Sequence, residues 1–171
     1  MKTGFGLLAL LVMTAAISGC GEDAEKEAFR QELIEKALND EVRKAGDAFM
    51  ADNAKAEGVV TTPSGLQYKV LASGDGDSPA VSDQVTVHYE GMRTDGHVFD
   101  SSYKRGKPTT FPLNRVIKGW TEGVSMMKRG DVWMLYIPPE LAYGATSPSE
   151  DIPANSTLIF KVELIDFTAA E

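Results

Sequence analysis

The sequence of 171 residues contains one cysteine and two histidines, and this scarcity excludes several kinds of chemistry. One cysteine cannot form an intramolecular disulfide or a cysteine zinc cluster, and two histidines leave little for a metal site. The sequence also lacks a G-x-S-x-G motif, a phosphate-binding P-loop and a dinucleotide fingerprint. We therefore expect a protein that uses no metal and no cofactor.

Basic residues are also in short supply. The chain has 17 Lys and Arg against 25 Asp and Glu, which gives a net charge of −8. Nucleic-acid binding needs a basic face that neutralises phosphates, so we expect no nucleic-acid partner. An all-helical bundle is disfavoured, because 16 Gly and 8 Pro indicate many turns. The length fits one domain with appendages.

An apolar run near the start, residues 5–13, is too short to cross a bilayer, which needs about 20 apolar residues. Lys2 precedes it, and this arrangement is typical of a secretory signal. The run leads to Ile-Ser-Gly-Cys at 17–20, which resembles the bacterial lipobox, whose cysteine is acylated before cleavage. The alternative is an ordinary signal peptide with an incidental cysteine.

We therefore expect residues 1–19 to be a lipoprotein signal peptide and Cys20 to be the lipidated residue. Several acyl chains on one residue give stable membrane anchoring, whereas one chain alone is marginal. Gly21 stands where inner-membrane lipoproteins often carry Asp. The sequence thus predicts an outer-membrane lipoprotein that faces the periplasm or the cell surface.

The segment 20–57 has a helical pattern. From residue 22 onward it contains no proline and a single glycine, Gly46, which is expected to weaken a helix there by roughly 1 kcal/mol relative to Ala. A continuous helix over 22–57 would be about 54 Å long. Two interpretations stay open: a solvated spacer behind the anchor, or a dimerisation helix that makes the protein a homodimer. The apolar residues that recur at helical spacing are Phe29, Leu33, Leu38, Val42, Ala45 and Phe49.

Residues 58–171 instead contain short segments in which apolar and polar residues alternate, as in half-buried strands. We expect about five short strands, including 66–71, 85–90, 133–137 and 158–164, and one short helix within 117–127. The economical arrangement is an α+β fold, in which a curved antiparallel sheet wraps around the single helix and a helical segment precedes the domain.

Large apolar residues stand beside the predicted loops of this domain. Any one of them would ordinarily be core, but together they are typical of an apolar ligand pocket with few polar groups. Asp100 follows the apolar pair Val98-Phe99, and it is either a capping residue or a polar group of that pocket. The apolar set is Tyr89, Phe99, Phe111, Val116, Ile117, Trp120, Tyr143 and Phe160.

Four motifs in register resemble the FKBP-type peptidyl-prolyl cis-trans isomerase domain. The resemblance covers about residues 59–168, and the lead-in 63–68 is similar to the bacterial envelope branch, the macrophage infectivity potentiators. It implies that 58–171 is an isomerase domain. The motifs are VHYEG with DGHVFDSS (87–91 and 95–102), VIKGWTEG (116–123), LAYGA (141–145) and IPANSTLIFKVEL (152–164).

The resemblance also implies roles for individual residues. Tyr89, Asp100 and Tyr143 would be the catalytic residues, and Tyr143 would offer its hydroxyl to a substrate carbonyl. Trp120 would lie under the prolyl ring, and Ile117 would supply a backbone N–H to the peptide. The substrate-binding residues would be Phe99, Phe111, Val116, Ile117, Trp120, Phe160 and Arg105, of which Arg105 would also pair with Asp100.

The implied activity is a prolyl isomerase that assists the folding of envelope proteins. Its partners would be proline-containing unfolded or nascent envelope polypeptides, and macrolides such as rapamycin or tacrolimus would inhibit it. A non-catalytic chaperone that holds unfolded chains in the same groove is the alternative. Leu141, Thr109 and Pro148 depart from the commonest eukaryotic pattern at the rim of the pocket.

Overall fold

The computed structural model describes residues 20–38 and 40–169. The chain divides into two compact units, and the boundary in the sequence lies between Glu35 and Lys36. The described part of the first unit is most of helix α1 (Cys20–Leu38), on which Phe29, Leu33 and Ile34 are exposed. The predicted signal peptide, residues 1–19, lies outside the described residues. Within those residues, no helix has the length and apolar character needed to cross a membrane.

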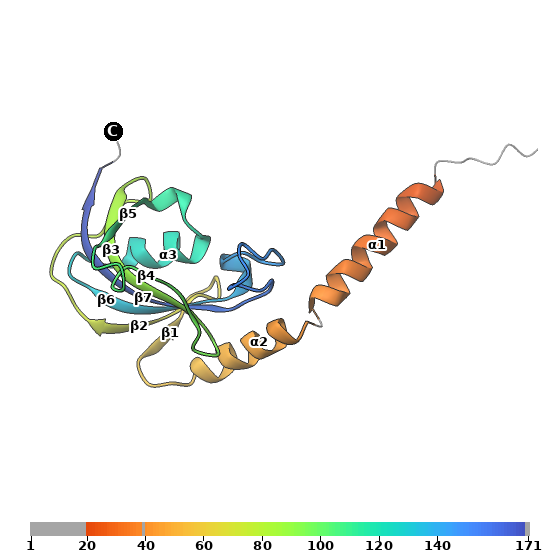
Figure 1. The fold of residues 1–171 in the computed structure, drawn as a ribbon, viewed down its shortest axis with the longest axis horizontal. Coiled ribbons are helices and arrows are strands. Elements are labelled where there is room, and N and C mark those ends of the chain that lie inside the picture. Colours follow the sequence, from red (N-terminus) through yellow and green to blue (C-terminus); the bar gives the residue numbers. More distant parts are fainter. Residues whose placement is uncertain (1–19, 39, 170–171) are drawn as a thin grey trace, which may run out of the picture. The chain divides into compact units, whose positions relative to one another are not determined.

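The second unit is built on one curved antiparallel sheet of seven strands (Figure 1). The strand order is β1-β2-β6-β7-β3-β4, and β5 pairs with β3 beside this path. The sequence predicted about five strands, and the three-residue β1 is too short to show an alternating pattern. The strands are β1 (Val59–Thr61), β2 (Gln67–Ala72), β3 (Gln84–Arg93), β4 (Val98–Ser101), β5 (Thr109–Pro112), β6 (Val132–Ile137) and β7 (Leu158–Thr168).

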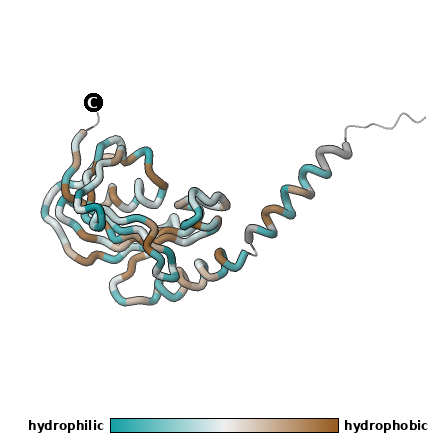
Figure 2. Tube along the Cα trace, viewed as in Figure 1, coloured by the Kyte–Doolittle hydropathy of each residue, from teal (hydrophilic) through white to brown (hydrophobic). Residues whose placement is uncertain are grey.

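Helix α3 (Lys118–Met126) packs on the concave face of this sheet. Two of its glycines allow the close approach: a Cβ on Gly119 would lie 2.5 Å from the side chain of Ile137, and one on Gly123 would lie 2.9 Å from that of Leu135. Figure 2 shows apolar residues recurring along the strands and α3. The predicted α+β fold, a curved sheet around a short helix, is confirmed.

The helical pattern over residues 22–57 corresponds to two helices and not to a single continuous one. Helix α1 ends at Leu38, and a second helix, α2, runs from Glu41 to Asn53. Asp40 starts α2 as its N-cap, with an extended backbone and a carboxylate that accepts a hydrogen bond from the Val42 amide at 2.8 Å. An Asp at this position satisfies an amide that has no partner within the helix, and so it favours a new helix start over continuation.

Gly46 lies where α2 touches the rest of the second unit. It is buried, and a Cβ built on it would lie 2.5 Å from Oγ1 of Thr157. The hydroxyl of Thr157 is itself buried and makes no hydrogen bond. The glycine expected to weaken the helix therefore permits it to pack tightly.

Three further contacts hold α2 on the outer face of the sheet, opposite α3. The rings of Phe49 and Tyr136 are 6.0 Å apart. The Gln67 amide donates to the carbonyl of Met50 at 2.9 Å and accepts from Asn53 at 2.8 Å. The structure therefore places α2 in the compact unit, and the spacer and dimer interpretations now concern α1.

Candidate active site

A cavity of about 470 Å³ opens between α3, the sheet and the loops that follow β4 and β6. The structure brings together nine of the ten predicted pocket residues, and the tenth, Arg105, contacts two of them from the side. Arg115 also lines the cavity and was missed by the sequence analysis. The described residues that line it are Tyr89, Phe99, Asp100, Phe111, Arg115, Val116, Ile117, Trp120, Tyr143 and Phe160.

Trp120 is the centre of the cavity wall. It is 4% exposed, and it meets three other rings edge to face: Tyr89 at 5.3 Å, Phe160 at 5.4 Å and Phe111 at 5.7 Å between centroids. Such edge-to-face pairs are favourable and fix the relative orientation of the rings. The result is a rigid aromatic box whose walls come from α3, β3, β5 and β7.

A glycine in β3 makes room for this box. A Cβ on Gly91 would lie 2.7 Å from ring atoms of both Phe99 and Phe160. These two rings are themselves perpendicular, at a centroid distance of 5.6 Å. No other residue type leaves the space for both rings at this point.

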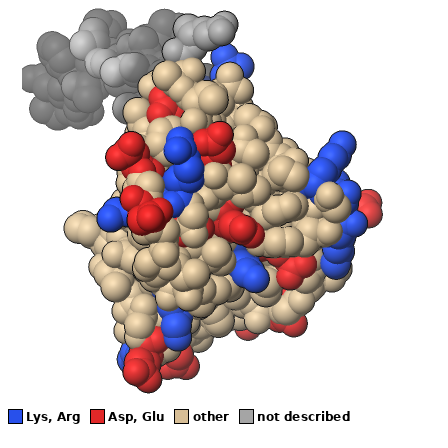
Figure 3. Space-filling view, turned by 90° about the vertical axis from the view of Figure 1, so that its left-hand side faces the viewer, with Lys and Arg blue, Asp and Glu red and all other residues tan. Residues whose placement is uncertain are grey.

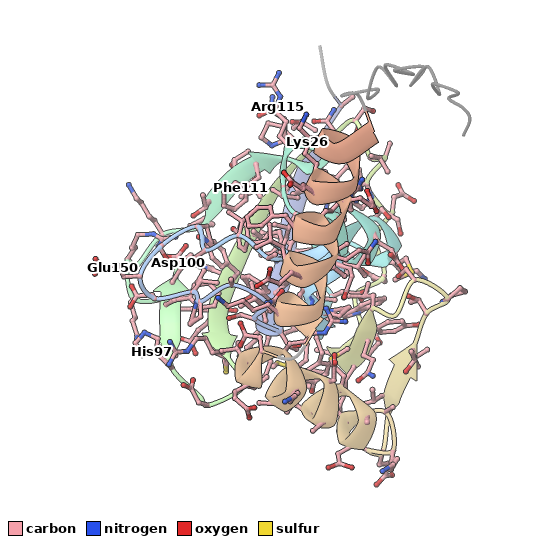
Figure 4. The ribbon with its side chains drawn as sticks, turned by 90° about the vertical axis from the view of Figure 1, so that its right-hand side faces the viewer. Lys26, His97, Asp100, Phe111, Arg115 and Glu150 are labelled. Carbon is pink, nitrogen blue, oxygen red and sulfur yellow. The ribbon has the colours of Figure 1, made fainter. Side chains whose placement is uncertain are left out.

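Asp100, the one acid among the described residues of the lining, is fully engaged by its neighbours. It accepts hydrogen bonds from the Tyr89 hydroxyl and from Nη1 of Arg105, and Nη2 of Arg105 donates to the same hydroxyl at 3.0 Å. Nη2 of Arg105 also donates a hydrogen bond to Oγ1 of Thr109 at 3.3 Å. Thr109, which departs from the commonest eukaryotic pattern, therefore helps to hold Arg105. Figure 4 shows Asp100 and Phe111 within this region.

These contacts decide the charge state of the pair. Burial alone would raise the pKa of Asp100, but the hydrogen bonds from Tyr89 and Arg105 outweigh it and lower that pKa below its usual value. Burial raises the pKa of Tyr89, and the bond to Asp100 raises it further. At neutral pH the site therefore holds a carboxylate and a protonated phenol.

Ser102, which no sequence pattern singled out, fixes the backbone of Tyr89. Ser102 is wholly buried, and its Oγ accepts from the Tyr89 amide at 2.7 Å, while its own amide donates to the Tyr89 carbonyl at 2.9 Å. The same hydroxyl lies 2.9 Å from Nδ1 of His88. Ser102 is thus a positioning residue for Tyr89.

Two polar groups at the cavity are free for a ligand. Tyr143 is 41% exposed, and within the described residues its hydroxyl makes no hydrogen bond. Ile117 is the N-cap of α3, where the first amides of a helix have no acceptor inside it. Across residues 20–38 and 40–169, no group of three or more His, Cys, Asp or Glu side chains is placed to hold a metal ion.

Comparison with known families agrees with this geometry. The profile of the FKBP-type peptidyl-prolyl cis-trans isomerase matches residues 76–165, just over half of the chain. The chain belongs to this family. A second profile, the domain amino terminal to FKBP-type peptidyl-prolyl isomerase, matches residues 12–70. The predicted resemblance is confirmed.

Individual FKBP-type relatives agree. The peptidyl-prolyl cis-trans isomerase Mip of Coxiella burnetii is 55% identical over 118 residues, which cover 69% of this chain and 51% of that protein. The outer membrane protein MIP of Legionella longbeachae is 45% identical over 148 residues, covering 83% of this chain and 64% of that protein. The chain therefore spans about half of the first relative and less than two thirds of the second.

A solved FKBP-type structure supports the fold as well. The crystal structure of FkpA from Escherichia coli is 40% identical, with a TM-score of 0.75, and the superposition covers 91% of this chain and 76% of that one. The match extends well beyond the pocket motifs. The FKBP fold is therefore the architecture of the second unit.

Proposed function

We propose that the protein is a peptidyl-prolyl cis-trans isomerase that acts on proline-containing polypeptides, unfolded or newly made, in the bacterial envelope. The observation that carries the proposal is the aromatic box around Trp120, which has a single acid at its edge, already paired with Tyr89 and Arg105. Such a cavity suits a reaction that needs no proton transfer and no nucleophile.

Isomerisation of an X–Pro bond has this character. Its barrier of about 18–20 kcal/mol comes from amide resonance. Each tenfold acceleration requires about 1.4 kcal/mol of preferential binding to the twisted transition state. The twisted amide is less polar than the planar one. An apolar box therefore disfavours the planar ground state relative to the twisted transition state.

The polar residues then orient the substrate. Tyr143 offers a hydroxyl to a substrate carbonyl, and the amide of Ile117 offers a second donor. Asp100 helps to set the orientation of the carbonyl of the X–Pro bond. Arg105 and Tyr89 hold the Asp100 carboxylate in place. Trp120 carries the prolyl ring.

The experiment is a protease-coupled assay of the full chain on a proline tetrapeptide. We expect acceleration of cis-to-trans conversion without added metal or nucleotide, unchanged by a chelator. Rapamycin should inhibit it by filling the aromatic box. A protein that suppresses aggregation but gives no acceleration would instead be the non-catalytic chaperone.

The rate in this assay should depend little on pH between about 5 and 8. Asp100 has a lowered pKa and Tyr89 a raised one, so neither changes charge in that interval. Because the pKa of Asp100 is depressed, the carboxylate is lost only as pH falls below its ordinary value of about 3.9. A titration of kcat/KM near pH 6 would contradict this assignment.

We further propose that the protein is an outer-membrane lipoprotein anchored through Cys20. The lipobox resemblance supports this, as does the name of the Legionella longbeachae relative, an outer membrane protein. The Cys20→Ser variant should appear in the soluble periplasmic fraction. If it still sediments with outer membranes, the anchor is elsewhere.

For α1 we propose dimerisation. Phe29 and Leu33 are one turn apart and exposed, at 62% and 50%, and Ile34 lies beside them. An i, i+4 apolar pair on an otherwise charged helix favours a partner helix over a solvated spacer. Sedimentation equilibrium of Cys20→Ser, with and without Leu33→Ser, tests this: a dimer that survives the second substitution would refute the assignment.

A further inference from the structure

Arg115 is the lining residue for which the pocket chemistry above has no use. It ends a short 3-10 helix, Leu113–Arg115, and the next two residues, Val116 and Ile117, form one wall of the cavity. Figure 4 shows its side chain at the edge of the site, extending outward from Phe111. It therefore reaches the space beyond the aromatic box, where the residues that flank a bound prolyl would pass.

Among the described residues, Arg115 also differs from the other arginines of the compact unit in having no carboxylate partner. The other four each form an ion pair: Arg43 with Asp47 and Glu140, Arg93 with Asp95, Arg105 with Asp100, and Arg129 with Asp166. In the part of the chain that the structure describes, no Asp or Glu oxygen lies within 4.0 Å of the Arg115 guanidinium. This is notable in a chain with eight more acids than bases.

Among the described residues, the charge around the cavity is correspondingly positive at this edge. Asp100 is already neutralised by Arg105, and neither the 3-10 helix at Leu113–Arg115 nor the first turn of α3 carries an acid. In the view of Figure 4, Glu150 and His97 lie on the other side of Asp100 from Arg115. On the face drawn in Figure 3, by contrast, acids and bases are interspersed.

We infer that Arg115 is a specificity-determining residue that favours substrates with a carboxylate side chain immediately before or after the proline. The inference rests on the proposed isomerase function. Two residues of extended chain span about 7 Å, so a neighbouring Asp or Glu can leave the box and meet a guanidinium at the rim. A guanidinium binds a carboxylate with two parallel hydrogen bonds, and a Lys at the same substrate position is repelled.

The test compares peptides that differ only in charge. Two tetrapeptide series carry Glu, Gln or Lys either immediately before or immediately after the proline, and kcat/KM is measured for the full chain at low salt. For at least one position we expect the Glu peptide to exceed the Lys peptide roughly two- to fivefold, a range typical of exposed ion pairs. Raising the salt concentration should shrink the ratio.

Three variants assign the effect. In Arg115→Gln the Glu-to-Lys ratio should fall to about one, and in Arg115→Lys, which keeps the charge, most of it should remain. Arg129→Gln is the matched control, because Arg129 pairs with Asp166 and does not line the cavity. Its ratio should equal that of the wild type.

The possible failures are distinguishable. Equal rates on the Glu and Lys peptides at both positions, with the Gln peptides still accelerated by the wild type, overturn the inference alone. A preference that survives in Arg115→Gln assigns it to another residue and also overturns it. A wild-type protein that accelerates none of the peptides overturns the isomerase function and this inference with it.

Discussion

The Asp100→Leu variant is expected to isomerise a proline tetrapeptide roughly ten- to a hundredfold more slowly than the wild type, a loss of about 1.4–2.8 kcal/mol in transition-state binding. The structure shows what the substitution removes. Asp100 is the shared acceptor of the Tyr89 hydroxyl and Arg105, so leucine leaves a phenol and a guanidinium without their carboxylate. The measurement is kcat/KM for both proteins, with rapamycin as a check that the assay reports the cavity.

Tyr143→Phe is the matched comparison. Its hydroxyl has no partner within the described residues, so the variant loses only a bond to substrate, worth roughly 0.5–1.5 kcal/mol. The thermal midpoint of Tyr143→Phe should not move.

In a pure holding chaperone, Asp100→Leu adds apolar surface and should keep or improve aggregation suppression. Wild-type rates in Asp100→Leu would remove the catalytic role of that residue.

Gly46→Ala is the second large effect we expect, and its sign opposes helix propensity. In an open helix alanine is better than glycine by roughly 1 kcal/mol. Here the added methyl would lie 2.5 Å from Oγ1 and 3.1 Å from Cβ of Thr157, so the Thr157 side chain, α2 or the loop must shift. We expect a net loss of about 1–3 kcal/mol in unfolding free energy, the usual range for overpacking. Denaturant unfolding of both proteins measures it.

Two controls isolate the contact. Ala48→Gly changes an exposed position of the same helix and should cost only the propensity difference, about 1 kcal/mol. Thr157→Ala removes the opposing atom, and its hydroxyl has no hydrogen bond to lose. The double variant Gly46→Ala, Thr157→Ala should recover most of the stability, and strict additivity would show that the clash is not the cause.

Most of the pocket was predictable because its residues, apart from Phe111, Arg105 and Arg115, lie in contiguous motifs that resemble those of the family. Trp120 and Ile117 share one motif, and Phe99 and Asp100 share another. The resemblance also paired Arg105 with Asp100, and the structure contains that pair. Arg115 lay next to a motif, and this adjacency was the one available sign of its place at the cavity.

The packing of α2 was not predictable in the same way. Gly46 and Thr157 are far apart in sequence, and a single glycine in a helical pattern is read as a weak point when its neighbour is unknown. The structure shows Asp40 as the N-cap of α2, whereas the apolar spacing around it showed no break. Ser102 likewise depends on two backbone contacts with Tyr89 that no local pattern reveals.

The position of β7 in the sheet has a consequence for the order of events during synthesis. β7 is the last strand in sequence, yet it lies between β6 and β3 and is what joins β1-β2-β6 to β3-β4-β5. A ribosome makes residues 158–168 after every other strand, so until they are available both halves have an open edge. Such long-range pairing is slow to form. The nascent chain is therefore an incomplete sheet that closes only when β7 is available.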